Sequence, residues 1–282
     1  MKKFALVFCF PFMVMPLLKG QEDMDLGIVG GVAVYSGDLS AQEFGIYLDD
    51  IGVGASIFTR NRFTRFLGVR TSLTYAHLSG NEKNGGGNLQ RGLNFKTDLF
   101  ELSVMGEWNI FHTGYYKAKT TFSPYLTLGV GAFYYDPRIT IGSREIRLRP
   151  LGTEGQGVSG YPSRYSPVQF SMPVGVGVHF IIKDRWTIGY EIVARRALTD
   201  YLDDVSDQSV IYGDVLLNNG ELAAQVSNPS LSPDPANYTQ AYTRGGRFND
   251  WFYVTGITIA YRIRNSGTSR SRYIDRNGCP RF

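Results

Sequence analysis

The feature that most constrains this chain is a strict alternation of residue types over residues 250–264. From Trp251 to Ile263, every second position carries a large apolar side chain or a threonine, and we interpret the residues between them as a small or polar face. A period of two residues indicates a β-strand with different surroundings on its two faces. No run of residues after position 20 is long and apolar enough for a membrane-spanning helix. The chain is therefore predicted to fold mainly as strands.

The same alternation recurs along the whole chain. Between Val168 and Phe180, for example, apolar residues alternate with glycine, serine and other small or polar residues. Glycine (33 residues), tyrosine (18) and phenylalanine (18) are abundant, which suits strands and tight turns rather than helices. We predict eight strands, at residues 25–36, 52–60, 65–78, 95–111, 122–136, 166–182, 185–198 and 250–264.

The predicted connections alternate between short and long. Because the strand number is even, all the long connections are expected at one end of the sheet. The longest is expected to contain a short helix near residues 210–225, where apolar residues recur before a proline-rich stretch. The short connections are residues 60–65, 112–121 and 183–184, and the long ones are residues 37–51, 79–94, 137–165 and 199–249.

Two architectures accommodate such strands. A soluble sandwich buries the apolar face and exposes the polar face, whereas a membrane barrel exposes the apolar face to lipid and encloses the polar face. Long strands, aromatic residues near strand ends and alternating connection lengths favour the barrel. We predict an all-β fold, an eight-stranded antiparallel transmembrane barrel over residues 21–264, with short periplasmic turns, long external loops and both termini in the periplasm of a bacterial outer membrane.

Charged residues occur at inward positions of the predicted strands. Eight strands leave an interior that side chains can fill, and a buried charge requires a partner. We expect at least some of these residues to pair as a polar plug without an open channel, although a proton path or pore lining is the alternative. The residues are Arg70, Glu101, Glu107, Glu191, Arg195 and Arg262.

Large aromatic residues lie near the ends of the predicted strands on their outward faces. Such residues form girdles where a barrel meets the two surfaces of a membrane. The expected lipid-interface aromatics are Trp108, Trp186, Trp251, Tyr253 and Tyr261.

The first 20 residues have the pattern of a secretory signal peptide. Two lysines precede an apolar run, and Gly20 precedes the expected cleavage site before Gln21. Removing Lys2, Lys3 and Lys19 lowers the net charge of +4 by three, so the sequence gives no support for nucleic-acid binding. Only Cys279 then remains of the two cysteines, which excludes an internal disulfide.

No motif predicts catalysis, a cofactor or a metal. Barrel enzymes that modify lipid A use a histidine with a serine and an acidic residue near the outer leaflet, and only His77 is expected near that rim; His112 and His179 are expected near the periplasmic end. A group of aspartates at residues 200–207 lacks the spacing and the glycine of a calcium loop. We interpret it as a solvated or helix-capping turn rather than a calcium site.

The segment at residues 265–282 has no role in a barrel. It is basic, and the predicted topology places it in the periplasm together with Cys279. One interpretation is a disordered remnant. The other is a docking segment for a periplasmic partner, formed by Arg270, Arg272, Arg276 and Cys279, in which the thiol could form an intermolecular disulfide in that oxidising compartment.

Four stretches carry a resemblance to a known family. They are Pro150–Gly157 (PLGTEGQG), Ala197–Ser206 (ALTDYLDDVS), Asn249–Gly256 (NDWFYVTG) and the closing Cys279-Pro280. The sequence resembles PorG-type outer-membrane proteins of the Bacteroidetes over essentially the whole mature chain. This resemblance implies an eight-stranded barrel that belongs to the type IX secretion machinery and associates with a periplasmic ring of PorK and PorN. It implies no catalytic residues.

Two non-enzymatic functions follow as hypotheses. The first is a barrel that anchors or positions a periplasmic secretion complex through its turns and basic tail. The second is an envelope barrel whose external loops bind a ligand, matrix or host surface. A lipid-modifying enzyme, with His77 as its catalytic residue, is a third and weaker hypothesis.

Overall fold

The computed structural model describes residues 23–40, 50–64, 66–82, 92–111, 120–183, 185–246 and 249–264. The expected signal peptide, His112 and the expected docking segment at residues 265–282 lie outside these residues.

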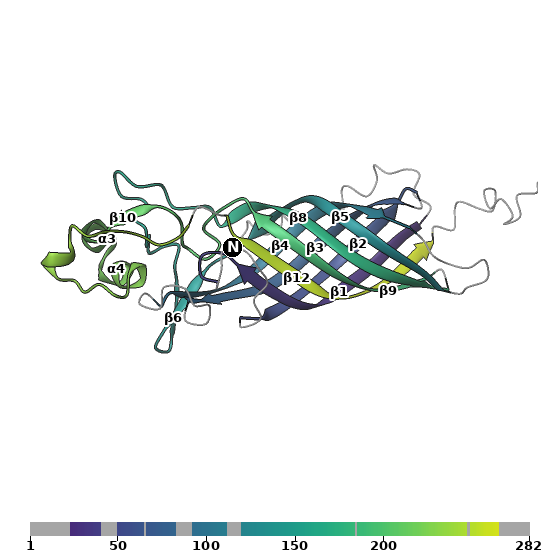
Figure 1. Cartoon of the computed structure of the whole chain (residues 1–282), viewed down its shortest axis with the longest axis horizontal. Helices are drawn as coiled ribbons and strands as arrows, with labels where there is room; N and C mark the ends of the chain where they lie inside the picture. Colours follow the sequence, from purple (N-terminus) through teal and green to yellow (C-terminus); the bar gives the residue numbers. More distant parts are fainter. Residues whose placement is uncertain are drawn as a thin grey trace, which may run out of the picture.

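Eight long strands form a closed antiparallel barrel (Figure 1), which confirms the predicted fold. Each strand pairs with the next long strand along the chain, and β1 closes the barrel by pairing with β12, with Ile28 opposite Ile259. The strand ends lie within three residues of those predicted. The strands are β1 (Asp23–Ser36), β2 (Gly52–Arg62), β3 (Leu67–Asn81), β4 (Asn94–Asn109), β5 (Thr120–Tyr134), β8 (Val168–Ile182), β9 (Trp186–Ala197) and β12 (Trp251–Arg264).

The two ends of the barrel differ in what connects the strands. At one end, the turn end, the connections are short and the first and last strands terminate with Asp23 opposite Arg264. At the other, the loop end, two long connections form structure of their own beyond the strands (Figure 1). They contain β6 (Arg138–Ile141), β7 (Arg144–Arg147), β10 (Ser209–Ile211), α3 (Tyr212–Asn219), α4 (Glu221–Ser227), the 3₁₀ helix η2 (Pro235–Asn237) and β11 (Ala241–Thr243).

The helix predicted near residues 210–225 is two short helices, α3 and α4. Gly220 lies between them with a φ of 95°, a conformation that ends the first helix and starts the second. Among the described residues, no helix is long and apolar enough to cross a membrane.

The outer face of the barrel is apolar around its whole circumference. Cross-strand partners continue this surface from strand to strand, as in the row Ile259, Ile28, Ile57 and Leu73 on β12, β1, β2 and β3. These side chains are exposed, and Val130 on the opposite wall is 66% exposed. Soluble monomers rarely expose a continuous apolar surface of this size.

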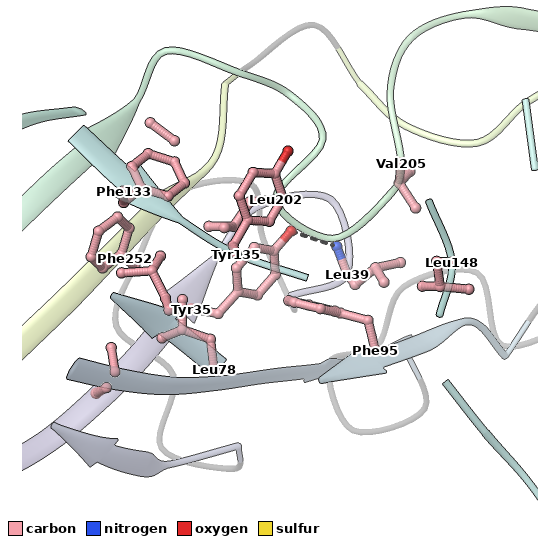
Figure 2. Close-up of a cluster of buried hydrophobic side chains, with 14 of the residues drawn as sticks. Tyr35, Leu39, Leu78, Phe95, Phe133, Tyr135, Leu148, Leu202, Val205 and Phe252 are labelled. Atoms are coloured by element: carbon pink, nitrogen blue, oxygen red, sulfur yellow. Dashed lines mark hydrogen bonds between the residues drawn. The ribbon is translucent and has the colours of Figure 1, made fainter. Parts of the chain in front are cut away.

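The inner face of the barrel changes from apolar at the loop end to charged in the middle and at the turn end. At the loop end it is lined by a large apolar and aromatic cluster, part of which is shown in Figure 2. Phe133 and Phe252 meet there with ring centroids 5.8 Å apart, and Tyr35 meets Phe95 edge-on at 4.8 Å. The expectation that the inward face of β12 is small or polar was therefore wrong at Phe252, because this position lies where loops fold into the barrel mouth and bury it.

Residues 199–246, in the longest connection, form a compact cap beyond the barrel mouth (Figure 1). α3 and α4 pack on a small core of their own around Val210, Tyr212 and Val215. Leu202 and Val205, from the start of the same long connection, instead belong to the cluster in the barrel mouth. The cap is thus fixed to the barrel by apolar packing.

Candidate functional site

The middle of the barrel interior holds two buried ion pairs between opposite walls. Arg70 on β3 donates two hydrogen bonds to Glu191 on β9, at 2.5 and 2.7 Å, and Tyr125 on β5 donates a third at 2.6 Å. Arg195 on β9 donates to Glu101 on β4 at 2.6 Å. Four of the six inward charges predicted from the sequence thus lie in two pairs. Each pair joins strands that are not neighbours, so it braces the barrel across its interior.

The turn end of the interior contains a second group of charges. Arg60 donates a hydrogen bond to Glu107 at 2.8 Å, and Asp25 lies 2.7 Å from Arg62 and 3.1 Å from Arg262. Glu107 and Arg262 are among the inward charges predicted from the sequence, whereas Asp25, Arg60 and Arg62 were missed. Arg60 could have been predicted, because it lies two residues after Phe58 and therefore on the same inward face of β2. Arg62 lies at the end of the strand.

Bulky groups fill the space between these charges. The Arg70 guanidinium lies 4.1 Å from the ring centre of Phe58, and His179 stacks on Tyr125 with centroids 4.6 Å apart. Cations beside aromatic faces gain favourable electrostatic energy. These contacts join strands of the barrel across its interior.

Two carboxylates at the loop end share one tyrosine hydroxyl. The Tyr35 hydroxyl lies 2.7 Å from Asp203 Oδ2 and 2.9 Å from Asp250 Oδ1, and all three residues are buried. A hydroxyl carries one proton and can donate to only one of them, so the second short contact requires a proton on a carboxyl group. Burial raises the pKa of both Asp203 and Asp250. Nearby carboxylates add to the shift, Asp250 and Asp38 for Asp203, and Asp38 and Asp200 for Asp250, which agrees with a neutral acid at this position.

A second network ties three connections together beside this pair. Asp204 accepts hydrogen bonds from Thr153 and Tyr165 at 2.5 and 2.6 Å, and Arg244 donates to Thr153 at 2.7 Å. Glu154 accepts from both the amide and the hydroxyl of Ser206. Burial raises the pKa of Glu154 to about 7, although Arg244 opposes this shift.

These two networks correct the interpretation of the aspartates at residues 200–207. Asp203 and Asp204 are buried structural residues rather than a solvated turn, because the loop folds into the barrel mouth. Asp200 is partly buried, and burial with nearby Asp38 and Asp207 raises its pKa to about 7. Within the described ranges, no group of three histidine, cysteine or acidic residues is arranged to hold a metal ion.

The three internal stretches that resemble the secretion family meet in these networks. Residues 150–157 supply Glu154, residues 197–206 supply Asp203, and residues 249–256 supply Asp250. They are far apart in the sequence but join the cap to the barrel mouth. The three stretches can be identified from the sequence. Their contact with one another cannot, because it depends on how the loops fold back onto the barrel mouth.

His77 lies on the outer face near the loop end, as expected. Its Nδ1 is 2.9 Å from Asp98 Oδ1, and Tyr75 donates a hydrogen bond to the same oxygen at 2.7 Å. Asp98 is exposed, and Tyr75 and His77 are half-exposed. An exposed pair of this kind contributes little to stability, and its partners here are a carboxylate and a phenol rather than a serine.

The predicted interface aromatics fall into two groups. Trp108, Trp186 and Tyr261 are exposed near the turn end, and Trp186 meets Tyr261 edge-on at 5.0 Å. At the loop end, Trp251 is half-buried and Tyr253 is buried. The interface role expected for Tyr253 was therefore wrong. Its cross-strand partner Val34 is buried too, so protein covers the outer face of the barrel there.

One known protein family matches about half of the chain. Residues 2–151 match the family described as DUF6089, a domain of unknown function. The chain belongs to this family. No curated protein matches the sequence.

Several solved structures are similar to this chain at low sequence identity. Ail, the attachment invasion locus protein of Yersinia pestis, solved with the heparin analogue sucrose octasulfate, is 12% identical with a TM-score of 0.41; the match covers 86% of this chain and 99% of Ail. OprG from Pseudomonas aeruginosa is 11% identical with a TM-score of 0.39, over 87% and 99% of the two chains. Neisserial surface protein A is 9% identical with a TM-score of 0.39, over 86% and 96%. These similarities concern the fold alone.

Proposed function

We propose that this protein spans a bacterial outer membrane and presents its cap outside the cell as a binding surface, without enzymatic activity. The observation that carries the membrane assignment is the combination of an exposed apolar outer wall with paired charges in the interior. From Phe100 to Ile110 the outward face of β4 and its extension is uncharged. Ten residues at about 3.3 Å each, tilted by about 40°, span about 25 Å along the barrel axis, which is the height of a lipid-facing band.

The lengths of the connections support one orientation in the membrane. Outer-membrane barrels have short periplasmic turns and longer external loops, so the loop end with its cap lies outside and Asp23 and Arg264 lie on the periplasmic side. The membrane assignment fails if the purified protein remains monodisperse without detergent, or if it separates from the outer-membrane fraction of the cell.

The cap supports the binding role. It is an ordered body with its own core, held to the barrel by apolar packing and two buried hydrogen-bond networks. A surface that is fixed in advance loses less conformational entropy when it binds a partner. Residues 209–243 contain three acidic residues and no lysine or arginine, so the charge of this segment disfavours a polyanionic partner.

A trimmed variant tests this role. Ser209 pairs with Thr243 at the base of the cap, so residues 210–242 can be replaced by a short glycine-serine linker without separating the flanking chain ends. We expect the variant to reach the outer membrane but to lose attachment of cells to protein-coated or glycan-coated surfaces. Attachment equal to that of the full protein contradicts the role.

The second candidate is an anchor for a periplasmic secretion complex of the type IX class, with ring proteins of the PorK and PorN type as partners. The composition of residues 265–282 and the PorG resemblance support it. Deleting residues 265–282 should then abolish secretion and leave attachment intact, which is the reverse of the effect of trimming the cap. Crosslinking in cells with Cys279→Ser as the control tests a disulfide to the partner; secretion that survives both the gene deletion and the tail deletion contradicts the anchor.

A further inference from the structure

Charged residues are rare on the outer wall of the barrel. On the outward faces of the eight long strands that the structure describes, the lysine, arginine and acidic residues are Lys96, Asp98 and Arg196. Lys96 lies two residues from Asp98 on the same face of β4 and forms an ion pair with Glu145 at 2.5 Å. These three charges compensate one another in part. Arg196 lies on β9, on a different part of the wall.

Arg196 is an exposed cation set in an apolar surface. Among the described residues, none forms an ion pair or a hydrogen bond with its side chain. Its cross-strand neighbours are Met172 on β8 and Trp251 on β12. Phe170 and Leu198 lie two residues closer to the loop end and are joined by a backbone hydrogen bond of 2.8 Å. Met172, Phe170 and Leu198 are 45%, 64% and 48% exposed, so apolar surface continues on this side of the guanidinium group.

The position of Arg196 along its strand places it at the edge of the proposed lipid-facing band. Trp186 lies on the same outward face at the turn end, where it is exposed and meets Tyr261 edge-on. Arg196 follows ten residues later, which is about 25 Å along the barrel axis for strands tilted by about 40°. A charge on the lipid-facing side of a barrel is tolerated near the membrane surface and is costly at the midplane. The height of Arg196 is therefore that of the outer membrane surface.

A cation in these surroundings requires an anion from outside the chain. The surroundings beside exposed apolar side chains in a membrane are less polar than water, so an unpaired charge is costly there. At this height the membrane supplies the phosphate groups of its outer-leaflet lipids, which the long arginine side chain can reach. A guanidinium group presents parallel N–H donors that fit two phosphate oxygens. We propose that Arg196 binds a phosphate group of lipid A, whose acyl chains contact the apolar surface around it. This proposal rests on the proposed outer-membrane location.

Native mass spectrometry of the full-length protein in detergent tests the proposal with two probes, bisphosphorylated lipid A and the same lipid without its phosphates. We expect the wild-type protein to retain the phosphorylated lipid preferentially. The variant Arg196→Gln should bind the phosphorylated lipid about fivefold more weakly and the dephosphorylated lipid equally well. The matched control Arg185→Gln removes an exposed cation next to Trp186 at the turn end and should leave the preference unchanged.

A conservative substitution separates charge from geometry. Arg196→Lys keeps the charge but loses the planar fork, so its affinity should lie between those of the wild type and Arg196→Gln. Equal retention of both lipids by the wild-type protein, an unchanged preference in Arg196→Gln, or displacement of the lipid by an equal concentration of inorganic phosphate overturns the proposal. Reconstitution into vesicles separates the two levels: a barrel that inserts but shows no preference for phosphate refutes this site, whereas a barrel that does not insert refutes the membrane assignment itself.

Discussion

The two halves of the barrel interior are stabilised by different interactions. The middle and the turn end contain paired charges, such as Arg70 with Glu191 and Arg60 with Glu107. The loop end contains rings and aliphatic side chains, followed by the carboxyl groups of Asp203 and Asp250, which share the Tyr35 hydroxyl.

The difference reflects what each half contacts. In the charged half, side chains from opposite walls of the barrel contact each other. Their ion pairs fix the spacing of strands that are not neighbours. In the apolar half, the wall meets returning loops, and apolar packing fixes the cap. The interior is thus divided into a brace, formed by charge pairs such as Arg70 with Glu191, and a socket, formed by the apolar cluster around Phe133 and Phe252. Each can be disrupted separately.

Removing one partner of a brace should have the largest effect. Glu191→Ala leaves Arg70 buried without its carboxylate, and breaking a buried pair in this way costs about 3–5 kcal/mol. The free energy of unfolding, measured by urea titration in lipid vesicles, should fall by that amount. The double variant Arg70→Met/Glu191→Leu should recover most of the loss, and no recovery would show that the pair is not the source of the effect.

Truncating a ring in the socket should have a somewhat smaller and differently placed effect. Phe252→Ala removes a ring that packs on Phe133, and a large-to-small change in a core costs about 3 kcal/mol. We expect amide hydrogen exchange to increase in residues 199–246 and to remain slow in the strands at the turn end. Uniformly faster exchange throughout the barrel would refute the division into two halves.

The acidic pair in the socket should make cap docking depend on pH. The folded-state pKa of Asp203 and of Asp250 is raised, so the docked cap holds protons that an undocked loop releases. The resulting stabilisation is complete below the ordinary carboxyl pKa and declines as the pH rises through the raised values. Glu154, with a pKa of about 7, adds to the decline near neutrality.

The substitution Asp203→Asn should suppress this dependence. An amide can donate to the Tyr35 hydroxyl and accept from the Val205 amide without a titratable proton. The measurement is limited proteolysis of the wild type and the variant, compared at each pH between 6 and 9. As the pH rises over this range, we expect the rate of wild-type cleavage within the cap to increase by roughly tenfold, equivalent to about 1.4 kcal/mol. A variant that follows the wild type across the range contradicts the assignment of the proton.

Sequence reasoning was most successful where the pattern is local. Leu102, Glu101 and their neighbours on β4 were assigned to the correct faces because the pleat of a strand fixes a period of two. It failed for Tyr253 and Phe252. Both residues follow the two-residue period, but they lie at the loop end, where packed loops cover the wall and fill the barrel mouth. The two-residue period predicts on which face of the sheet a residue lies, but not which part of the protein or its surroundings that face contacts.

The candidate site shows the same limit. Arg70 and Glu191 were both assigned to the interior, yet their pairing across 121 residues follows from how the strands stagger around the closed barrel. Asp203 and Asp204 were interpreted as solvated because a run of aspartates normally is. Only the fold of the loop brings Tyr35, Arg244 and Asp250 to them.

The amino-acid sequence by itself determined the strands, their order and the two faces of each, since these follow from hydrophobic period and from residues close in the chain. The tertiary structure alone decided which charges pair, which carboxyl groups lose their water, and that the cap is fixed to the barrel. Those outcomes depend on the distance and dielectric surroundings of groups far apart in the sequence, which no local pattern encodes.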